Sequence, residues 1–236
     1  MKINKVASRD QRLMVDDGLL AEIAGYAGLR PGDVVLEVGA GSGNLTAKLA
    51  ETAKVSAVEK DFVLYGTLER RFRGDERVQL IRGDALRVEY PIYNKIVSNI
   101  PYSVSRKLVE HFILEGFDLA VLVVQKEFAD KLAAKPGSDN YRMISALAQS
   151  TCSVEVLREI PPQAFRPQPR VASAAVRMRQ RWKPPGDYLA FLNRLFSGKN
   201  KKIRNILDDA PADYQQRKPA DMTPEEMKEL YGVYLI

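Results

Sequence analysis

The chain has little sulfur or imidazole chemistry, since its 236 residues include one cysteine, Cys152, and one histidine, His111. One cysteine excludes a disulfide within the chain, and the two residues together are too few for a zinc cluster. No apolar run approaches the roughly 18 residues that a membrane-spanning helix needs. Residues 1–10 lack the apolar core of a secretory signal. These absences predict a metal-free, cytoplasmic protein with no membrane partner.

Acidic residues are scarce in two stretches of the C-terminal half, although the whole chain carries 30 of them against 36 lysines and arginines. Residues 158–181 hold six arginines and one acid, Glu159, and residues 194–204 hold five cations and no acid. The net charge of +6 is therefore clustered. Clustering favours a polyanionic partner, and the simpler alternative is a generally basic solvated surface.

Short apolar runs alternate with segments of helical spacing along most of the chain. The strand-like runs are residues 34–38, 55–58, 78–81, 95–98, 119–124, 153–157 and 171–178. The helix-like segments are residues 19–27, 44–52, 64–72, 105–115, 128–132 and 144–149. This alternation predicts an α/β fold with a doubly wound, mostly parallel sheet.

A change of composition near residue 182 predicts a second, smaller unit. Residues 182–186 read Trp-Lys-Pro-Pro-Gly, which is typical of a linker. Beyond it, residues 188–196, 202–207 and 224–231 have the spacing of three short helices. We therefore expect a main domain over residues 1–181 and a small helical domain over residues 182–236.

Polar or glycine-rich motifs directly follow four of the predicted strands. They are the glycine turn at 39–43, Glu59, Asp84 and the Asn-Ile-Pro-Tyr run at 99–102. In parallel α/β sheets, ligands bind outside the carboxyl ends of the strands. The four motifs therefore predict one shared site at this edge of the sheet.

The first three motifs suit a nucleotide-like cofactor. A glycine turn lets a ligand approach the backbone closely, but the third glycine of the dinucleotide pattern is missing at Asn44. Glu37 could reach a cofactor amine through water, and Glu59 could accept both hydroxyls of a ribose. Asp84 could accept from an adenine amino group. A helix cap or solvated turn is the alternative for each acid.

The fourth motif suits an exocyclic amine. The side-chain oxygen of Asn99 and the carbonyl of Pro101 are acceptors, and Tyr102 offers an aromatic face. The alternative is a turn that only closes a strand. The three motifs on the same edge decide in favour of a binding site.

These segments resemble the motif series of class I S-adenosylmethionine-dependent methyltransferases, and more narrowly the small-subunit ribosomal RNA adenine N6-dimethyltransferases. The resembling segments are residues 35–43, 58–61, 83–85 and 98–102. Residues 165–173 match that family's F-x-P-x-P-x-V-x-S segment, which is more specific than the glycine turn. The resemblance covers nearly the whole chain and implies a Rossmann-like methyltransferase fold.

The resemblance implies S-adenosylmethionine as the cofactor, with the ribose on Glu59 and the adenine on Asp84. The family opens with Gln-Asn/His-Phe-Leu, whereas Arg12 stands here in place of the Asn or His, where it could bond the methionine carboxylate. The expected cofactor positions are Arg12, Met14, Glu37, Gly39, Gly41, Glu59, Lys60, Asp84, Ala85 and Asn99.

The resemblance also implies that the target adenine is flipped out of the RNA and held between Tyr102 and Phe165. Asn99 and Pro101 would accept its two N6 hydrogens, so these four residues are the expected catalytic set. The expected RNA-binding residues are Arg166, Arg170, Lys199, Lys201, Lys202 and Arg204.

The leading hypothesis is an enzyme that dimethylates two neighbouring adenines near the 3′ end of small-subunit ribosomal RNA. Its expected partners are that RNA and the pre-assembled small subunit, with the enzyme acting as a monomer. The alternatives are methylation of large-subunit RNA or DNA adenine, and an assembly factor that acts mainly by binding. An NAD dehydrogenase is the weakest candidate because of the missing glycine.

Overall fold

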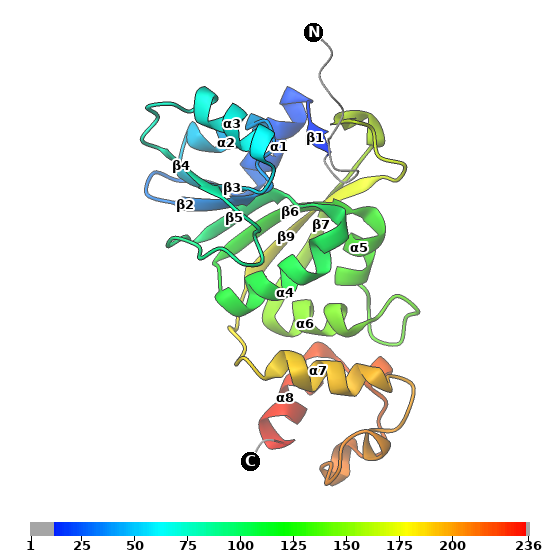
Figure 1. Cartoon of the computed structure of the whole chain (residues 1–236). Coiled ribbons are helices and arrows are strands. Elements are labelled where there is room, and N and C mark those ends of the chain that lie inside the picture. The colour runs from blue at the N-terminus through cyan, green and yellow to red at the C-terminus, as the bar shows by residue number, and fades with distance from the viewer. Residues whose placement is uncertain (1–11, 235–236) are drawn as a thin grey trace.

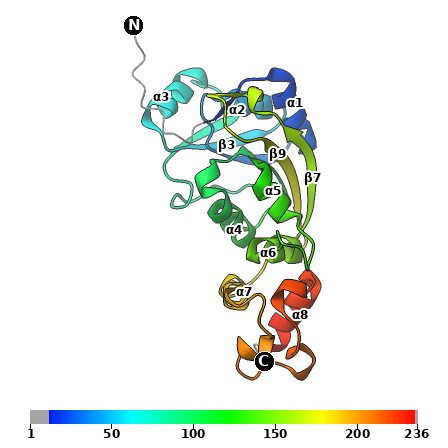
Figure 2. The same cartoon turned by 90° about the vertical axis from the view of Figure 1, so that its right-hand side faces the viewer.

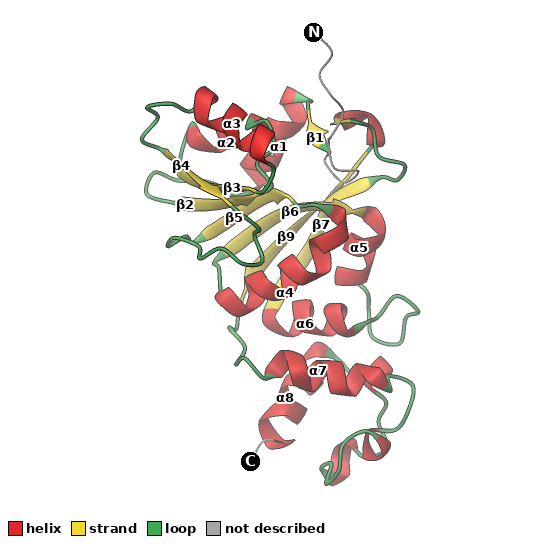
Figure 3. Ribbon diagram, viewed as in Figure 1, coloured by secondary structure: helices red, strands yellow, loops and turns green. Residues whose placement is uncertain are grey.

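The computed structural model of the chain describes residues 12–234. A central sheet carries helices on both faces, and a smaller helical part lies beyond one of these layers (Figure 1). Figure 3 shows the same layers coloured as helices and strands. The predicted α/β architecture with a mostly parallel sheet is confirmed. None of the helices within residues 12–234 is long and apolar enough to cross a membrane.

The central sheet has seven strands in the order β4-β3-β2-β5-β6-β9-β7. The first five in this order run parallel, and β9 pairs antiparallel with both β6 and β7. A separate two-stranded sheet pairs β1 with β8. The strands are β1 Leu13–Met14, β2 Val34–Val38, β3 Lys54–Glu59, β4 Val78–Arg82, β5 Lys95–Asn99, β6 Leu119–Gln125, β7 Cys152–Ile160, β8 Phe165–Arg166 and β9 Ser173–Gln180.

The central strand β6 shows why the sheet needs helices on both faces. Val121 and Val123 belong to one apolar cluster, and Leu122 and Val124 belong to another. Successive side chains of a strand point to opposite faces, so a continuously apolar strand must be covered twice. Helices α1–α3 cover one face, and α4–α6 the other (Figure 2). The helices are α1 Asp17–Tyr26, α2 Asn44–Ala50, α3 Phe62–Arg71, α4 Ser105–Glu115, α5 Lys126–Leu132, α6 Met143–Thr151, α7 Tyr188–Ser197 and α8 Pro224–Tyr234.

The C-terminal helices share an apolar cluster with the layer above them. Leu192 of α7 and Leu230 of α8 are fully buried in the same cluster as Leu147 of α6. The predicted boundary at residue 182 therefore separates two parts that are packed together. The predicted helix at 202–207 is wrong, since the structure has only a 3₁₀ turn there, Ile203–Asn205.

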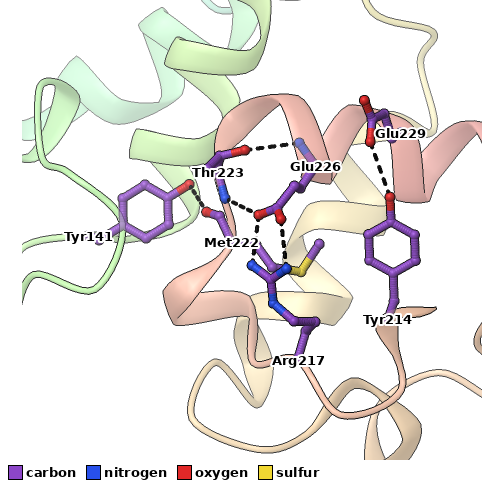
Figure 4. A network of polar contacts seen from close by, with 7 residues as sticks. All are labelled: Tyr141, Tyr214, Arg217, Met222, Thr223, Glu226 and Glu229. Carbon is purple, nitrogen blue, oxygen red and sulfur yellow. Dashed lines mark hydrogen bonds and ion pairs between the residues drawn. The ribbon is translucent and has the colours of Figure 1, made fainter. Parts of the chain in front are cut away.

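A polar network anchors the C-terminal part (Figure 4). The guanidinium of Arg217 donates to both carboxylate oxygens of Glu226, at 2.7 and 2.8 Å. Glu226 also accepts from the backbone N–H of Thr223, whose hydroxyl accepts from the Glu226 N–H, so the two form a capping box before α8. The buried hydroxyl of Tyr141 donates to the carbonyl of Met222 at 3.1 Å. This last bond ties the segment before α8 to the loop before α6.

Candidate active site

A cavity of about 590 Å³ opens at the carboxyl ends of the parallel strands. The segments that follow β2, β3, β4 and β5 contribute to its wall, so the four motifs do converge on one site. The predicted site residues that line it are Arg12, Gly39, Gly41, Glu59, Lys60, Asp84, Ala85, Asn99, Pro101 and Tyr102.

Two residues of the glycine turn, Gly39 and Gly41, line the cavity. Gly41 has a φ of +60°, in the left-handed region that favours glycine. A Cβ atom at Gly41 would lie 2.5 Å from Cδ2 of Leu13. The Gly41 N–H donates to Oε2 of Glu59 at 2.8 Å, which joins the first motif to the second.

Glu59 is fixed at both oxygens by the protein. Oε2 accepts from Gly41, and Oε1 accepts from the N–H of Asp61 at 2.8 Å. The side chain is buried but borders the cavity. An ionised carboxylate has about four acceptor positions, so each oxygen can still accept one hydroxyl. The geometry fits the predicted ribose diol.

Asp84 is oriented by Lys60 and by the backbone. Its Oδ2 accepts from Lys60 Nζ at 2.9 Å, and its Oδ1 accepts from the N–H of Leu86 at 3.1 Å. The hydrogen bond from Lys60, followed by that from the backbone, lowers the pKa of Asp84 below its ordinary value. Asp84 therefore stays ionised near neutral pH and can accept from an amino group.

Phe62, the first residue of α3, also lines the cavity, and the sequence analysis did not predict it. Its ring is 72% exposed although it is large and apolar, and it borders the cavity beside Glu59 and Asp84. An exposed aromatic face at this place can stack on a flat ring. The available signal was a phenylalanine three residues after the strand-ending Glu59.

Asn99 carries the most informative feature of the site. Its Nδ2 donates to the carbonyl of Arg12 at 2.7 Å, which settles which way the amide points. Its Oδ1 is buried and has no hydrogen-bond partner among the described residues. Leaving a buried acceptor unsatisfied costs about 1–3 kcal/mol. This oxygen therefore has the capacity to accept one more hydrogen bond.

Pro101 does not fit its predicted role as the second acceptor. Its carbonyl already accepts from the N–H of Val104 at 3.2 Å and from the hydroxyl of Ser105 at 3.0 Å. A carbonyl oxygen has two lone pairs, so both are in use. Ile100, the residue before it, also lines the cavity.

Tyr102 borders the cavity, and its hydroxyl is hydrogen-bonded to that of Ser173. The two hydroxyls form a hydrogen bond at 2.5 Å, and the Ser173 side chain is completely buried. Ser173 is the last residue of the F-x-P-x-P-x-V-x-S segment, so this bond connects that segment to the Asn-Ile-Pro-Tyr turn. Sequence reasoning noted the segment but gave Ser173 no role.

Phe165 and Met14 do not reach the cavity, contrary to expectation. They are register partners in the β1–β8 pair, and both are buried in the apolar cluster of the α1–α3 layer. The Phe165 side chain is 0% exposed. Burying an aromatic ring with a methionine stabilises the fold more than presenting it to water. In this structure Phe165 cannot stack on a base.

Glu37 also faces away from the predicted ligand. It is 2% exposed, does not border the cavity, and accepts from the hydroxyl of Thr46 at 2.6 Å. Burial raises the pKa of Glu37 to about 8, despite the opposing hydrogen bond from Thr46. Its carboxyl is therefore largely protonated at neutral pH, and its role is in the packing of α2 against β2.

The predicted RNA-binding residues fall into two separate groups. Arg166, in β8, and Arg170, in the loop after it, are exposed, and residues 199–204 lie below α7 at the other end of the molecule (Figure 1). Lys199 and Lys202 are half-buried and donate to the carbonyl of Tyr141 and to Gln216. The groups do not form one continuous patch.

Comparison with known protein families agrees with this geometry. The family described as "Ribosomal RNA adenine dimethylase" matches residues 4–226. The chain belongs to this family. Membership confirms the resemblance drawn from the motifs.

Individual relatives cover most of the chain. A protein of Methanosarcina mazei named "Probable ribosomal RNA small subunit methyltransferase A" is 37% identical over 92% of this chain and 89% of its own length. A protein of the same name from Thermococcus onnurineus is 33% identical over 93% of this chain and 88% of its own length.

Two solved structures share the fold. A dimethyladenosine transferase from Plasmodium falciparum superposes with a TM-score of 0.84 at 24% identity, covering 95% of this chain and 98% of its own. The 23S rRNA methyltransferase ErmE superposes with a TM-score of 0.75 at 26% identity, covering 95% and 100%. Both likenesses include the C-terminal helical part, because each covers nearly the entire chain.

Proposed function

We propose that this protein transfers methyl groups from S-adenosylmethionine to N6 of two adjacent adenines near the 3′ end of small-subunit ribosomal RNA. The observation that carries the proposal is Asn99, which lines the cavity and whose buried Oδ1 lacks a partner among the described residues. The names of the archaeal relatives support the small subunit as the source of the RNA.

The residues of the first three motifs fit S-adenosylmethionine. Glu59 would accept the ribose hydroxyls, Asp84 the adenine amino group, and Phe62 would cover the adenine ring. The turn at Gly39 and Gly41 gives the methionine part close access to the backbone. When bound, the cofactor supplies a methyl group on a positively charged sulfur.

Asn99 would act on the target nitrogen by positioning it. The N6 lone pair of adenine is delocalised into the ring and is therefore a poor nucleophile. Accepting the N6 hydrogens favours a pyramidal nitrogen whose lone pair points at the methyl group, so positioning and electrostatics supply most of the acceleration. Because the Pro101 carbonyl is occupied, we assign the second acceptor to the main-chain carbonyl of Ile100. Tyr102, braced by Ser173, would stack on the base.

The deciding experiment is labelled methyl transfer from S-adenosylmethionine to small subunits isolated from cells that lack the modification. Mass spectrometry should locate N6,N6-dimethyladenosine at two adjacent positions near the 3′ end. Large subunits serve as a parallel substrate because of the likeness to the 23S rRNA methyltransferase ErmE. DNA is a second parallel substrate, because an Asn-x-Pro-Tyr run suits any exocyclic amine. If large subunits or DNA were methylated in preference to small subunits, the proposed substrate would be wrong and the preferred one would take its place. Deproteinised RNA, tested beside assembled subunits, shows which form is the substrate.

The Asn99→Ala variant tests the proposed mechanism. Removing one preorganised polar group that acts on the reacting atoms costs about 10²–10³ in turnover, whereas calorimetry should show nearly unchanged S-adenosylmethionine binding. Asn140→Ala, at an exposed loop position, is the matched control and should keep full activity. Near-normal turnover of the Asn99 variant would disprove the assigned role.

A further inference from the structure

A second cavity of about 590 Å³ lies where the helices of the sheet meet the C-terminal part. Its wall is built from the first turn of α4, the end of α5, the start of α6 and the end of α7. Residues 102–104 border the active-site cavity, and Arg106 borders this second cavity. Residues of one short segment, 102–108, therefore line both cavities.

The wall of the second cavity is strongly basic. Among the described residues that line it, none is acidic. Its four cations come from four different segments of the chain: Arg106, Lys131, Arg142 and Lys199. Cations gathered from separate segments around one hollow form a site for an anion, and phosphate is the anion that Arg and Lys recognise together.

Two of these cations have acidic neighbours that do not line the cavity. Arg106 pairs with Glu110 at 2.7 Å, and Lys131 pairs with Glu127 at 2.6 Å, each one helical turn away. Exposed pairs of this kind contribute little stability. Both cations can therefore turn toward a phosphate at small cost.

The other two cations are positioned by main-chain carbonyls. Arg142 donates from Nη1 to the carbonyls of Asp139 and Tyr141, and Lys199 donates from Nζ to the same Tyr141 carbonyl at 3.3 Å. A guanidinium has five N–H donors and an ammonium three, so each keeps donors for a ligand. Tyr141 is fixed in turn by its bond to Met222 (Figure 4).

Aromatic rings add a second kind of contact. Phe128 and Phe196 are only partly buried and both line the cavity, together with the polar side chains of Asn193 and Ser197. The ring of Phe196 packs on that of Tyr141, with centroids 5.8 Å apart. A basic groove with aromatic side chains is how proteins bind single-stranded nucleic acid. An acidic peptide would use the cations and have less use for the rings.

We propose that this second cavity binds a nucleotide of the RNA strand that neighbours the flipped target adenine. The four cations hold its phosphate, and Phe128 or Phe196 stacks on its base. This inference rests on the proposed function, since it takes the active-site cavity as the place of the target. Gripping the strand on both sides of the first turn of α4 fixes the register of the RNA relative to Asn99.

The test compares two double variants that each remove two positive charges, one from α4 and one from α5 or the turn that follows it. Arg106→Gln with Lys131→Gln changes the cavity. Lys107→Gln with Lys135→Gln changes neighbouring exposed positions that do not line it. Binding of small subunits and of deproteinised small-subunit RNA is measured by filter retention against salt, and methyl transfer gives KM and kcat. Calorimetry with S-adenosylmethionine checks that the first cavity is intact.

The cavity variant should bind RNA and subunits about a hundredfold more weakly, because it loses two charged contacts and each contributes a factor of about ten. Because the four cations hold one phosphate, losing that contact to a single strand should reduce the slope of log K against log salt by about 0.7. KM should rise accordingly while cofactor affinity stays unchanged, and the control variant should match the wild type.

Equal binding by the two variants would overturn the proposal. So would a loss confined to assembled subunits with RNA binding intact, because the occupant would then be a ribosomal protein. The binding measurements do not depend on turnover. If the wild type transferred no methyl group to small subunits, the proposed function would be wrong. The binding measurements would still show whether the second cavity binds RNA.

Discussion

Replacing Glu37 by glutamine tests whether the raised pKa of this buried carboxyl governs the stability of the fold. The pKa of Glu37 is about 8 in the folded protein against an ordinary value of 4.5, chiefly because burial disfavours the charged form. Between these two values the folded chain binds one more proton at this site than the unfolded chain. Stability therefore falls as pH rises through this interval and levels off above pH 8.

The magnitude follows from the size of the shift. From pH 5.5 to pH 8.5, the extra proton changes the free energy of unfolding by about 3 kcal/mol, at 1.36 kcal/mol for each pKa unit. For a chain of this length, that loss lowers the melting temperature by about 6 °C. Glutamine cannot ionise and can still accept from Thr46, so Glu37→Gln should lack this part of the pH dependence.

The assay is thermal unfolding of the wild type and the variant at both pH values. Glu51→Gln is the matched control, since the Glu51 side chain is 66% exposed and should leave the pH dependence as in the wild type. Above pH 8 the Glu37 variant should melt at a higher temperature than the wild type. If both lose stability equally over this range, Glu37 is ionised in the fold and the argument from burial is wrong.

Two further substitutions test the site. Ser173→Ala removes the hydroxyl that is hydrogen-bonded to Tyr102, which costs about 1 kcal/mol. Single-turnover methyl transfer should slow several-fold while the affinity for S-adenosylmethionine stays unchanged. An equal loss of rate and of cofactor affinity would indicate that the substitution damages the whole site. Gly41→Ala places a Cβ 2.5 Å from Leu13 in left-handed backbone, so calorimetry should show weakened S-adenosylmethionine binding. Gly66→Ala, in α3 with nothing within 4 Å of its Cβ, should bind normally and gain about 0.5–1 kcal/mol of stability.

The elements with a strong local pattern were predictable. The expected ranges of β2 and α4 agree with the observed ones, Val34–Val38 and Ser105–Glu115. Both carry continuous or amphipathic apolar patterns that depend on their own residues alone. The convergence of Glu59, Asp84 and Asn99 was predictable too, because parallel strands bring their carboxyl ends to one edge.

Very short strands and contacts between residues far apart in the chain were not predictable. The pair of β1 and β8 joins two-residue segments about 150 positions apart in the chain, and so short a strand has no periodicity of its own. That pairing decides that Met14 and Phe165 are buried. Nothing within residues 165–173 distinguishes a stacking phenylalanine from a core phenylalanine, because both are apolar and follow a turn.

The sequence by itself determined the class of fold, the edge of the sheet that carries the site, and the chemistry of its acceptors. It could do so because residue type and the alternation of strands with helices are local, and the direction of the strands follows from general rules of parallel sheets. Only the tertiary structure decided which acceptors are free. It leaves Asn99 Oδ1 without a partner among the described residues, occupies the Pro101 carbonyl, encloses Glu37 and gathers four distant cations around a second cavity. Those outcomes depend on which groups meet when separate elements pack, and no segment carries that information alone.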